Sequence, residues 1–232
     1  MKNISSQYEL LFEKLHQQKE RYSEKNLAIF TPAKGTKYQH KLMIVGRAVN
    51  GWIIKMDKNK RDDLGRLNTE VIKTLPNSNL NWVNDMWGKT VNKYSTKKSA
   101  FWRVAKAIAA NLTPSEKQDV VNTIVWSNLY KAAKWEGGNP STRLMNVQYD
   151  KCLELLKLEI ELYQPERIVF LTGYNWANHF LTDMGTTRIP LKKYDLVEYT
   201  GDYKGVRIIV GQHPQGKPEQ KHVKEILSAF EQ

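Results

Sequence analysis

Apolar residues recur at helical spacing along much of the chain. Near the N-terminus, Leu10, Leu11 and Leu15 fall close to one face, which predicts an amphipathic helix over 6–23. The same spacing predicts further helices over 99–112, 149–163, 175–181 and 217–230. Ser99 is expected to cap the helix that follows it. The buried stripe is clearest in the helix over 149–163, where it consists of Cys152, Leu153, Leu156, Ile160 and Tyr163.

Short apolar runs bounded by polar residues or glycine predict strands between these helices. The runs cover 41–45, 122–126, 167–171, 196–199 and 206–210. The first strand is expected to end at Gly46, and a turn at Gly201-Asp202 is expected to join the last two. Because strands and helices alternate, we expect an α/β fold, a three-layer α/β/α sandwich with a mainly parallel central sheet.

The domain organisation follows from the same pattern. We expect a single domain over 1–232 that begins with the helix over 6–23. The segment 50–98 is poorer in pattern and rich in Lys, Asn and Trp, which indicates a long insertion after the first strand. Its Trp82, Trp87 and lysines could follow a phosphate backbone or simply cover the sheet, and both interpretations stay open.

The chain is strongly basic. Its 232 residues include 36 Lys and Arg against 24 Asp and Glu, a formal net charge of +12. Such a surface favours polyanions, because binding phosphates releases counterions, although a merely solvated basic surface is the alternative. Seven Trp and eleven Tyr add aromatic faces on which bases could stack, or which pack in the core. A polyanionic partner is therefore one expectation from composition, and a merely solvated basic surface is the other.

Several classes of protein are excluded or lack support. A single cysteine, Cys152, rules out a disulfide within the chain, a cysteine-rich zinc site and an all-cysteine iron–sulfur cluster. No apolar run reaches the ~20 residues of a membrane span, and the first residues form no apolar signal core. No GxGxxG, GxxxxGK[ST] or HExxH motif is present in a fitting context. We expect a cytoplasmic monomer without membrane association, metal or cofactor.

Polar turns after the predicted strands indicate where chemistry could occur, since ligands of open parallel sheets bind at the carboxyl ends of the strands. The turns cover 46–52, 127–131, 172–176 and 211–217. Each has a structural alternative. Gly46 could serve only a tight turn, Asn128 could cap backbone groups, and His213 could be an ordinary loop histidine. The aromatic residues Trp52, Phe101 and Trp102 could belong to the core.

The order of these turns resembles the uracil-DNA glycosylase superfamily. The matching segments are Ile44-Val45-Gly46 to Asn50, Ile124 to Lys131, Gln164-Pro165 with Ile168 to Gly173, and Ile209 to Gln215. The spacing holds over roughly 41–230, and the central block from Asn128 to Gly173 is the most similar. The resemblance implies a glycosylase that flips a base out of DNA into a pocket, so DNA, single-stranded DNA included, is the partner it implies.

The resemblance also implies roles for particular residues. His213 would donate a hydrogen bond to the base oxygen as negative charge develops there, and Asn128 would read the imide edge of the base. Asn50 would position the water, and one of Trp52, Phe101 and Trp102 would stack on the base. The further residues implied to contact substrate are Gly46, Arg47, Ala48, Lys131, Gln215 and Lys217.

Two loops depart from the family pattern. Arg47, Ala48 and Val49 stand where family members carry Asp, Asn or Glu, often followed by Pro, and Gln215 replaces the usual Ser. Either Asn50 takes over the water-positioning role, or activity is lost or altered. The alternatives to a glycosylase are therefore a non-catalytic nucleic-acid-binding protein on the same scaffold and a protein that binds a free nucleobase or nucleoside.

Overall fold

The computed structural model describes residues 4–49, 54–61, 63–89, 95–113 and 119–232. Its chain forms two compact units, which are described separately. The first unit comprises Met1–Pro32, Gly46–Ser78 and Ser127–Leu162, and the second comprises Ala33–Val45, Asn79–Trp126 and Tyr163–Gln232. No helix in the described ranges is long and apolar enough to cross a membrane.

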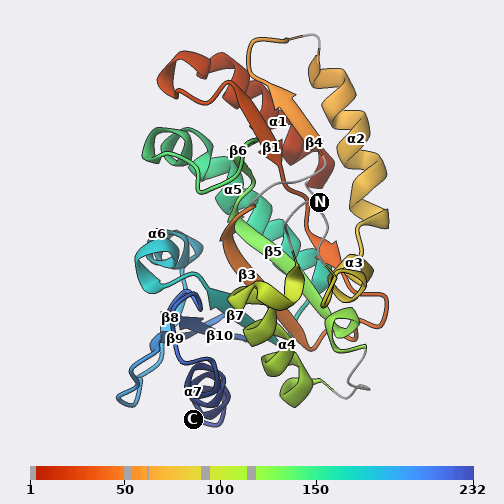
Figure 1. The fold of residues 1–232 in the computed structure, drawn as a ribbon. Helices are drawn as coiled ribbons and strands as arrows, with labels where there is room; N and C mark the ends of the chain where they lie inside the picture. The colour runs from red at the N-terminus through yellow and green to blue at the C-terminus, as the bar shows by residue number, and fades with distance from the viewer. Residues whose placement is uncertain (1–3, 50–53, 62, 90–94, 114–118) are drawn as a thin grey trace. The chain divides into compact units, whose positions relative to one another are not determined.

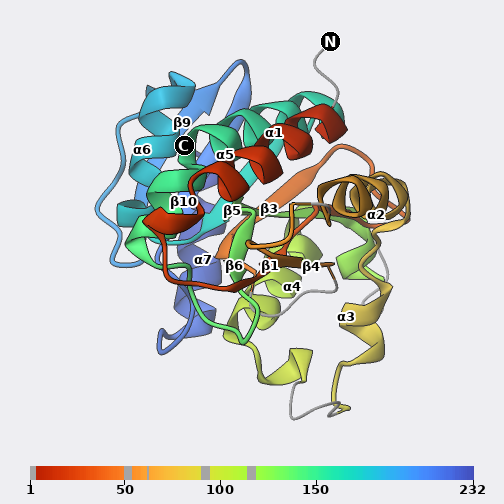
Figure 2. The ribbon, with the colours of Figure 1, turned by 90° about the horizontal axis from the view of Figure 1, so that it is seen from above.

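The first unit is built on a small antiparallel sheet with the strand order β4-β1-β6. These strands are β1 (Asn26–Ile29), β4 (Ile54–Asp57) and β6 (Ala132–Lys134). The helices α1 (Ile4–Gln17), α2 (Asp63–Asn77) and α5 (Thr142–Tyr163) share one apolar core with the sheet. Figures 1 and 2 show these elements together, and the Lys14–Asp150 ion pair joins α1 to α5.

The core of the first unit follows directly from helical spacing. Tyr8, Leu11, Phe12 and Leu15 lie on one face of α1 and are completely buried. Leu67 and Val71 of α2 are also completely buried and lie on one face of their helix. This helix lies in the segment that was interpreted as a poorly patterned insertion. That segment contains β4, α2, the short helix α3 (Asn81–Asp85) and a 3₁₀ turn at Thr96–Lys98.

A larger sheet runs in the order β2-β5-β3-β7-β10-β9-β8. The strands are β2 (Ala33–Lys34), β3 (Leu42–Ala48), β5 (Ile124–Tyr130), β7 (Arg167–Leu171), β8 (Thr187–Arg188), β9 (Val197–Tyr203) and β10 (Val206–Gly211). β3, β7 and β10 are parallel, whereas β2 with β5, β9 with β10 and β8 with β9 are antiparallel. The α/β class is therefore confirmed, with mixed sheets that include parallel strands.

The second unit also contains α4 (Ala100–Leu112), α6 (Tyr174–Met184) and α7 (Glu219–Phe230). Both α6 and α7 pack against β9 and β10, and α4 packs against α7 (Figure 1). Seven α-helices, α1 to α7, are thus present in the described residues. The centres of the parallel strands are apolar and buried, as expected of strands covered by helices.

The predicted helices are confirmed in position, with changes at their ends. Ser99 caps α4 as expected, because its hydroxyl oxygen accepts a hydrogen bond from the Trp102 N–H at 3.4 Å. α5 begins at Thr142 rather than at 149, and its predicted stripe from Cys152 to Tyr163 is buried. The helix expected over 6–23 ends at Gln17 and is followed by a 3₁₀ turn at Lys19–Arg21.

Several strand boundaries differ from the prediction, including that of β9, which was expected over 196–199 and covers Val197–Tyr203. β3 continues beyond Gly46 to Ala48, and β5 covers Ile124–Tyr130 instead of 122–126. The turn between β9 and β10 lies at Lys204-Gly205, not at Gly201-Asp202. Lys204 and Gly205 have φ of 53° and 84°, the left-handed values that a tight two-residue hairpin needs.

Candidate functional site

Of the residues predicted to bind substrate, Asn128 and Lys131 lie together in the first unit. Asn128 is part of β5 and is 1% exposed, whereas Lys131 directly follows the strand and is completely buried. The predicted polar turn over 127–131 is therefore mostly strand. A lysine in this position must find internal partners, because burying an ammonium group alone is very unfavourable.

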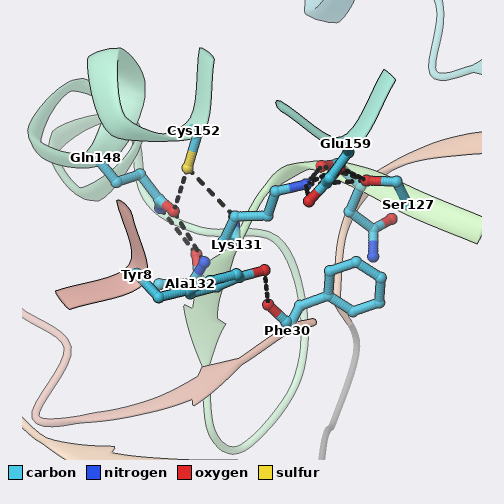
Figure 3. Close-up of polar contacts among 9 residues, drawn as sticks. Tyr8, Phe30, Ser127, Lys131, Ala132, Gln148, Cys152 and Glu159 are labelled. Atoms are coloured by element: carbon cyan, nitrogen blue, oxygen red, sulfur yellow. Dashed lines mark hydrogen bonds and ion pairs between the residues drawn. The ribbon is translucent and has the colours of Figure 1, made fainter. Parts of the chain in front are cut away.

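Lys131 finds these partners in a compact polar network, which Figure 3 shows. Its Nζ lies 2.9 Å from Oε2 and 2.8 Å from Oε1 of Glu159, which is also completely buried. The same ammonium donates to Ser127 Oγ at 2.9 Å and to the Asn128 carbonyl oxygen at 2.7 Å. The Ser127 hydroxyl in turn donates to Glu159 Oε2 at 2.5 Å. We call Ser127, Lys131 and Glu159 the buried triad.

Helix α5 supplies a polar stripe that holds the chain beside the triad. The Gln148 side chain forms two hydrogen bonds of 2.8 Å with the backbone N–H and carbonyl of Ala132. Next along the stripe, the Cys152 sulfur accepts the Lys131 backbone N–H at 3.4 Å and donates to Gln148 Oε1 at 3.3 Å. Burial raises the pKa of the Cys152 thiol to about 12, so it stays protonated and can act as this donor.

The opposite side of the segment is held by the N-terminal part of the first unit. The Phe30 N–H donates to the Lys131 carbonyl oxygen at 2.7 Å, and the Tyr8 hydroxyl donates to the Phe30 carbonyl oxygen at 2.8 Å (Figure 3). The Lys131 ammonium also lies 5.7 Å from the centre of the Phe30 ring. Residues 127–132 are consequently fixed by both backbone and side-chain contacts.

The Asn128 side chain contrasts with this dense network. Its Nδ2 atom is buried and has no hydrogen-bond partner among the described residues. Leaving a buried donor unsatisfied costs about 1–3 kcal/mol, so such groups are rare in native proteins and often meet a ligand or a bound water. The arrangement presents an amide donor for which the described ranges supply no acceptor, next to backbone that is firmly held.

The second unit contains two of the three predicted aromatic residues, Phe101 and Trp102. Phe101 and Trp102 of α4 join Trp82 and Trp126 in one cluster, in which the rings of Trp102 and Trp126 are 5.0 Å apart. The remaining ring contacts in the cluster span 5.2–6.4 Å. Trp102 is 2% exposed and Phe101 is half-buried. Trp102 therefore belongs to the core in this conformation, and Phe101 is the more accessible of the two.

The predicted histidine loop follows β10 in the second unit. His213 is half-buried, and its Nδ1 accepts the Gln215 backbone N–H at 3.3 Å. In a neutral ring this hydrogen bond assigns the proton to Nε2, so the imidazole has a donor of defined position. Gln215 and Lys217 are exposed, and the Lys217 N–H closes the loop onto the Pro214 carbonyl oxygen at 3.0 Å.

The remaining predicted residues belong to the end of β3 and to the segment that follows it. Gly46 is buried within the strand, and Arg47 and Ala48 are its last, half-buried residues. Asn50 and Trp52, the predicted water-positioning residue and one of the candidate stacking residues, lie outside the described residues. Asn128 belongs to the first unit and His213 to the second, and their convergence at one pocket stays a prediction.

Sequence reasoning missed the polar partners of Lys131. Glu159 stands on the helix stripe that was predicted to be apolar, seven positions after Cys152 and three after Leu156. A charged residue on a buried stripe is a usable signal, because it requires a buried partner of opposite charge. Ser127 and Phe30 gave no comparable signal, since neither a serine nor a phenylalanine requires a buried charge as its partner.

Comparison with known proteins yields no assignment: no protein-family model and no curated protein matches the chain. Among the described residues, no group of three or more His, Cys, Asp or Glu side chains is arranged to hold a metal ion. The candidate residues are therefore described by their own chemistry: the first unit has a buried amide donor, and the second unit has a histidine loop and an aromatic cluster.

Proposed function

We propose that the protein hydrolyses the N-glycosidic bond of uracil, or of a related damaged base, in DNA, on a three-layer α/β/α scaffold of the uracil-DNA glycosylase type. The observation that carries the proposal is the buried Nδ2 of Asn128, which has no hydrogen-bond partner in the part of the chain that the structure describes. It lies in the strand whose sequence resembles the base-reading motif of that superfamily. A pyrimidine carbonyl oxygen is an acceptor that suits this donor.

The chemistry assigns a part to each candidate group. Water adds its oxygen to the sugar C1′ as the bond from C1′ to the base nitrogen breaks, and the bonding electron pair leaves with the base. Negative charge then develops on the base oxygens, where the Nε2–H of His213 donates a hydrogen bond. The proton released by the water is taken up by the departing base or by solvent. Phe101 is the described candidate for stacking on the flipped ring.

A second candidate function is nucleic-acid binding without turnover. Where family members place an acidic or amide side chain after the first glycine, this chain has Arg47 and Ala48, which continue β3. Neither side chain can activate water. In this alternative the +12 charge supports salt-dependent binding, and the Asn128 amide holds an unpaired base without cleaving it.

The two candidates are separated by an excision assay. The protein is incubated with single- and double-stranded oligonucleotides that contain one uracil, and abasic sites are detected by alkaline cleavage. We expect excision that falls about 10²–10³-fold in His213→Ala, because a charge-stabilising donor is lost. His179→Ala, a change at an exposed histidine of α6, is the matched control and should retain full activity.

Binding to the same oligonucleotides is measured over a range of salt concentrations. Salt-sensitive binding without excision would favour the non-catalytic alternative and contradict the glycosylase. Thermal stabilisation by free uracil without any affinity for DNA would instead favour a nucleobase-binding protein. Absence of excision, of DNA binding and of stabilisation by uracil would remove the proposal as a whole.

A further inference from the structure

The buried triad is poorly explained as a source of stability. Lys131 and Glu159 are both completely buried, and taking two charges out of water cancels most of the attraction between them. Elsewhere on its inner face, α5 packs through apolar residues such as Leu155 and Leu156, which would serve equally well at position 159. A buried ion pair in such surroundings indicates that it holds neighbouring groups in a defined position.

The group that the buried triad holds in position is the backbone of Asn128. The Lys131 ammonium donates to the carbonyl oxygen of Asn128 itself at 2.7 Å. One residue earlier, the Ser127 hydroxyl lies between Lys131 and Glu159, at 2.9 Å from Nζ and 2.5 Å from Oε2. The backbone of Asn128 is thus fixed at its own carbonyl group and through the side chain of the residue before it.

The Asn128 side chain obtains its direction from this backbone. Because Nδ2 has no hydrogen-bond partner among the described residues, the donor is not fixed in place by an acceptor of its own. A donor that is aimed by its backbone needs little reorganisation when an acceptor arrives, which is the physical meaning of preorganisation. Loss of the backbone restraint would leave the same amide in place but less precisely directed.

We propose that Lys131 and Glu159 are positioning residues, which act through Ser127 and the Asn128 carbonyl to aim the Asn128 amide at the carbonyl oxygen of a bound base. This inference rests on the proposed function of Asn128 as the residue that reads the base. It assigns Lys131 an internal role in place of the contact with substrate that the sequence predicted. Neither residue of the pair touches the reacting atoms.

The test replaces both charges at once. Lys131→Met/Glu159→Met removes the pair without leaving a lone buried charge, so the fold and the melting temperature should be retained. We expect kcat/KM for uracil excision to fall about 10–100-fold, since small misplacement of a recognition group is costly to the rate. The matched control is Glu154→Met/Lys157→Met, which removes a half-exposed ion pair from the same helix and should leave kcat/KM unchanged.

A spectroscopic readout tests the restraint without relying on activity. The two side-chain amide protons of Asn128, assigned by comparison with Asn128→Asp in ¹⁵N-labelled protein, should give one sharp pair of signals in the wild type. The same signals should be broadened or multiplied in Lys131→Met/Glu159→Met and unchanged in the control. If the wild type excises no uracil, the proposed function fails, whereas this spectroscopic test of the restraint remains valid.

One outcome of this test would overturn the inference directly. A folded Lys131→Met/Glu159→Met protein with wild-type Asn128 signals would show that the pair does not position the amide. An unfolded double variant would assign the pair to the fold itself. A milder change, Ser127→Ala, then provides the remaining check, and it should alter the Asn128 signals in the same direction but to a smaller extent; unchanged signals would count against the restraint.

Discussion

The Nε2 atom of His222 lies 2.5 Å from the position that a Cβ atom would take on Gly211. Gly211 is the last residue of β10 and precedes the histidine loop, and His222 is a completely buried residue of α7. A glycine is therefore required at this position by close packing. The contact determines how closely α7 can approach the strand end from which His213 extends.

Gly211→Ala should destabilise the protein by about 1–3 kcal/mol, the usual cost of overpacking a tight core. The added methyl group would also come within 3.3 Å of Ile226, so the helix has little room to yield. Shortening the histidine in Gly211→Ala/His222→Ala should recover part of the loss. Urea unfolding of the two single variants and the double variant measures the coupling, and strictly additive effects would contradict the proposed clash.

The same histidine should make stability depend on pH. Burial lowers the pKa of His222 from 6.5 to about 4; His213 and Lys217 act in the same direction, and Glu225 opposes them. The unfolded chain therefore takes up a proton at higher pH than the folded protein does. Stability is fully present above pH 6.5 and is lost as the pH falls towards 4, by at most about 3 kcal/mol.

This pH dependence can be isolated by comparing the wild type with His222→Leu. The difference in unfolding free energy between pH 7 and pH 4.5 should be smaller in the variant, because the leucine does not titrate. His179→Leu, at an exposed position, should retain the wild-type dependence. Equal slopes for all three proteins would show that His222 takes up its proton equally well in the folded state.

The hairpin between β9 and β10 gives a prediction that tests the corrected turn. Gly205 has φ of 84° and open space where a Cβ atom would lie, so Gly205→Ala should cost about 1 kcal/mol through backbone strain alone. Gly201 lies within β9, where a Cβ atom would stand 2.5 Å from the Tyr199 hydroxyl. Gly201→Ala should therefore be at least as damaging, and thermal unfolding of the two variants ranks them.

Gly201 also illustrates why the sequence misplaced this turn. Gly-Asp is a common turn dipeptide, and nothing local distinguishes it from Lys204-Gly205. The glycine at 201 is explained by the ring of Tyr199, a contact that becomes visible only when the strand is folded. The parallel strand at 167–171 was predicted with its correct ends, because an apolar run between Pro165 and Gly173 leaves no alternative.

The candidate site was predictable to a lesser degree. Ser127 and Asn128 were assigned to a turn because polar residues seldom occupy a buried strand, and here their burial is made possible by Lys131 and Glu159. The lysine and the glutamate are separated by 28 positions, so no local pattern pairs them. Helical periodicity did place the apolar residues of the α5 stripe correctly, but it gave no account of the buried polar residues Gln148 and Glu159 on the same helix.

The energetics of the buried pair provide the last prediction. Lys131→Met leaves the Glu159 carboxylate buried without its cation, and Glu159→Gln leaves the ammonium without its anion, so each change should cost about 3–5 kcal/mol. Lys131→Met/Glu159→Met should lie within about 1 kcal/mol of the wild type or above it, because the desolvation cost of both charges is removed. Urea unfolding monitored by tryptophan fluorescence measures all three variants. If the losses in unfolding free energy of the two single variants simply add in the double variant, the two charges do not compensate one another inside the protein. A double variant that loses much less than this sum would show that the two charges act as one energetic unit.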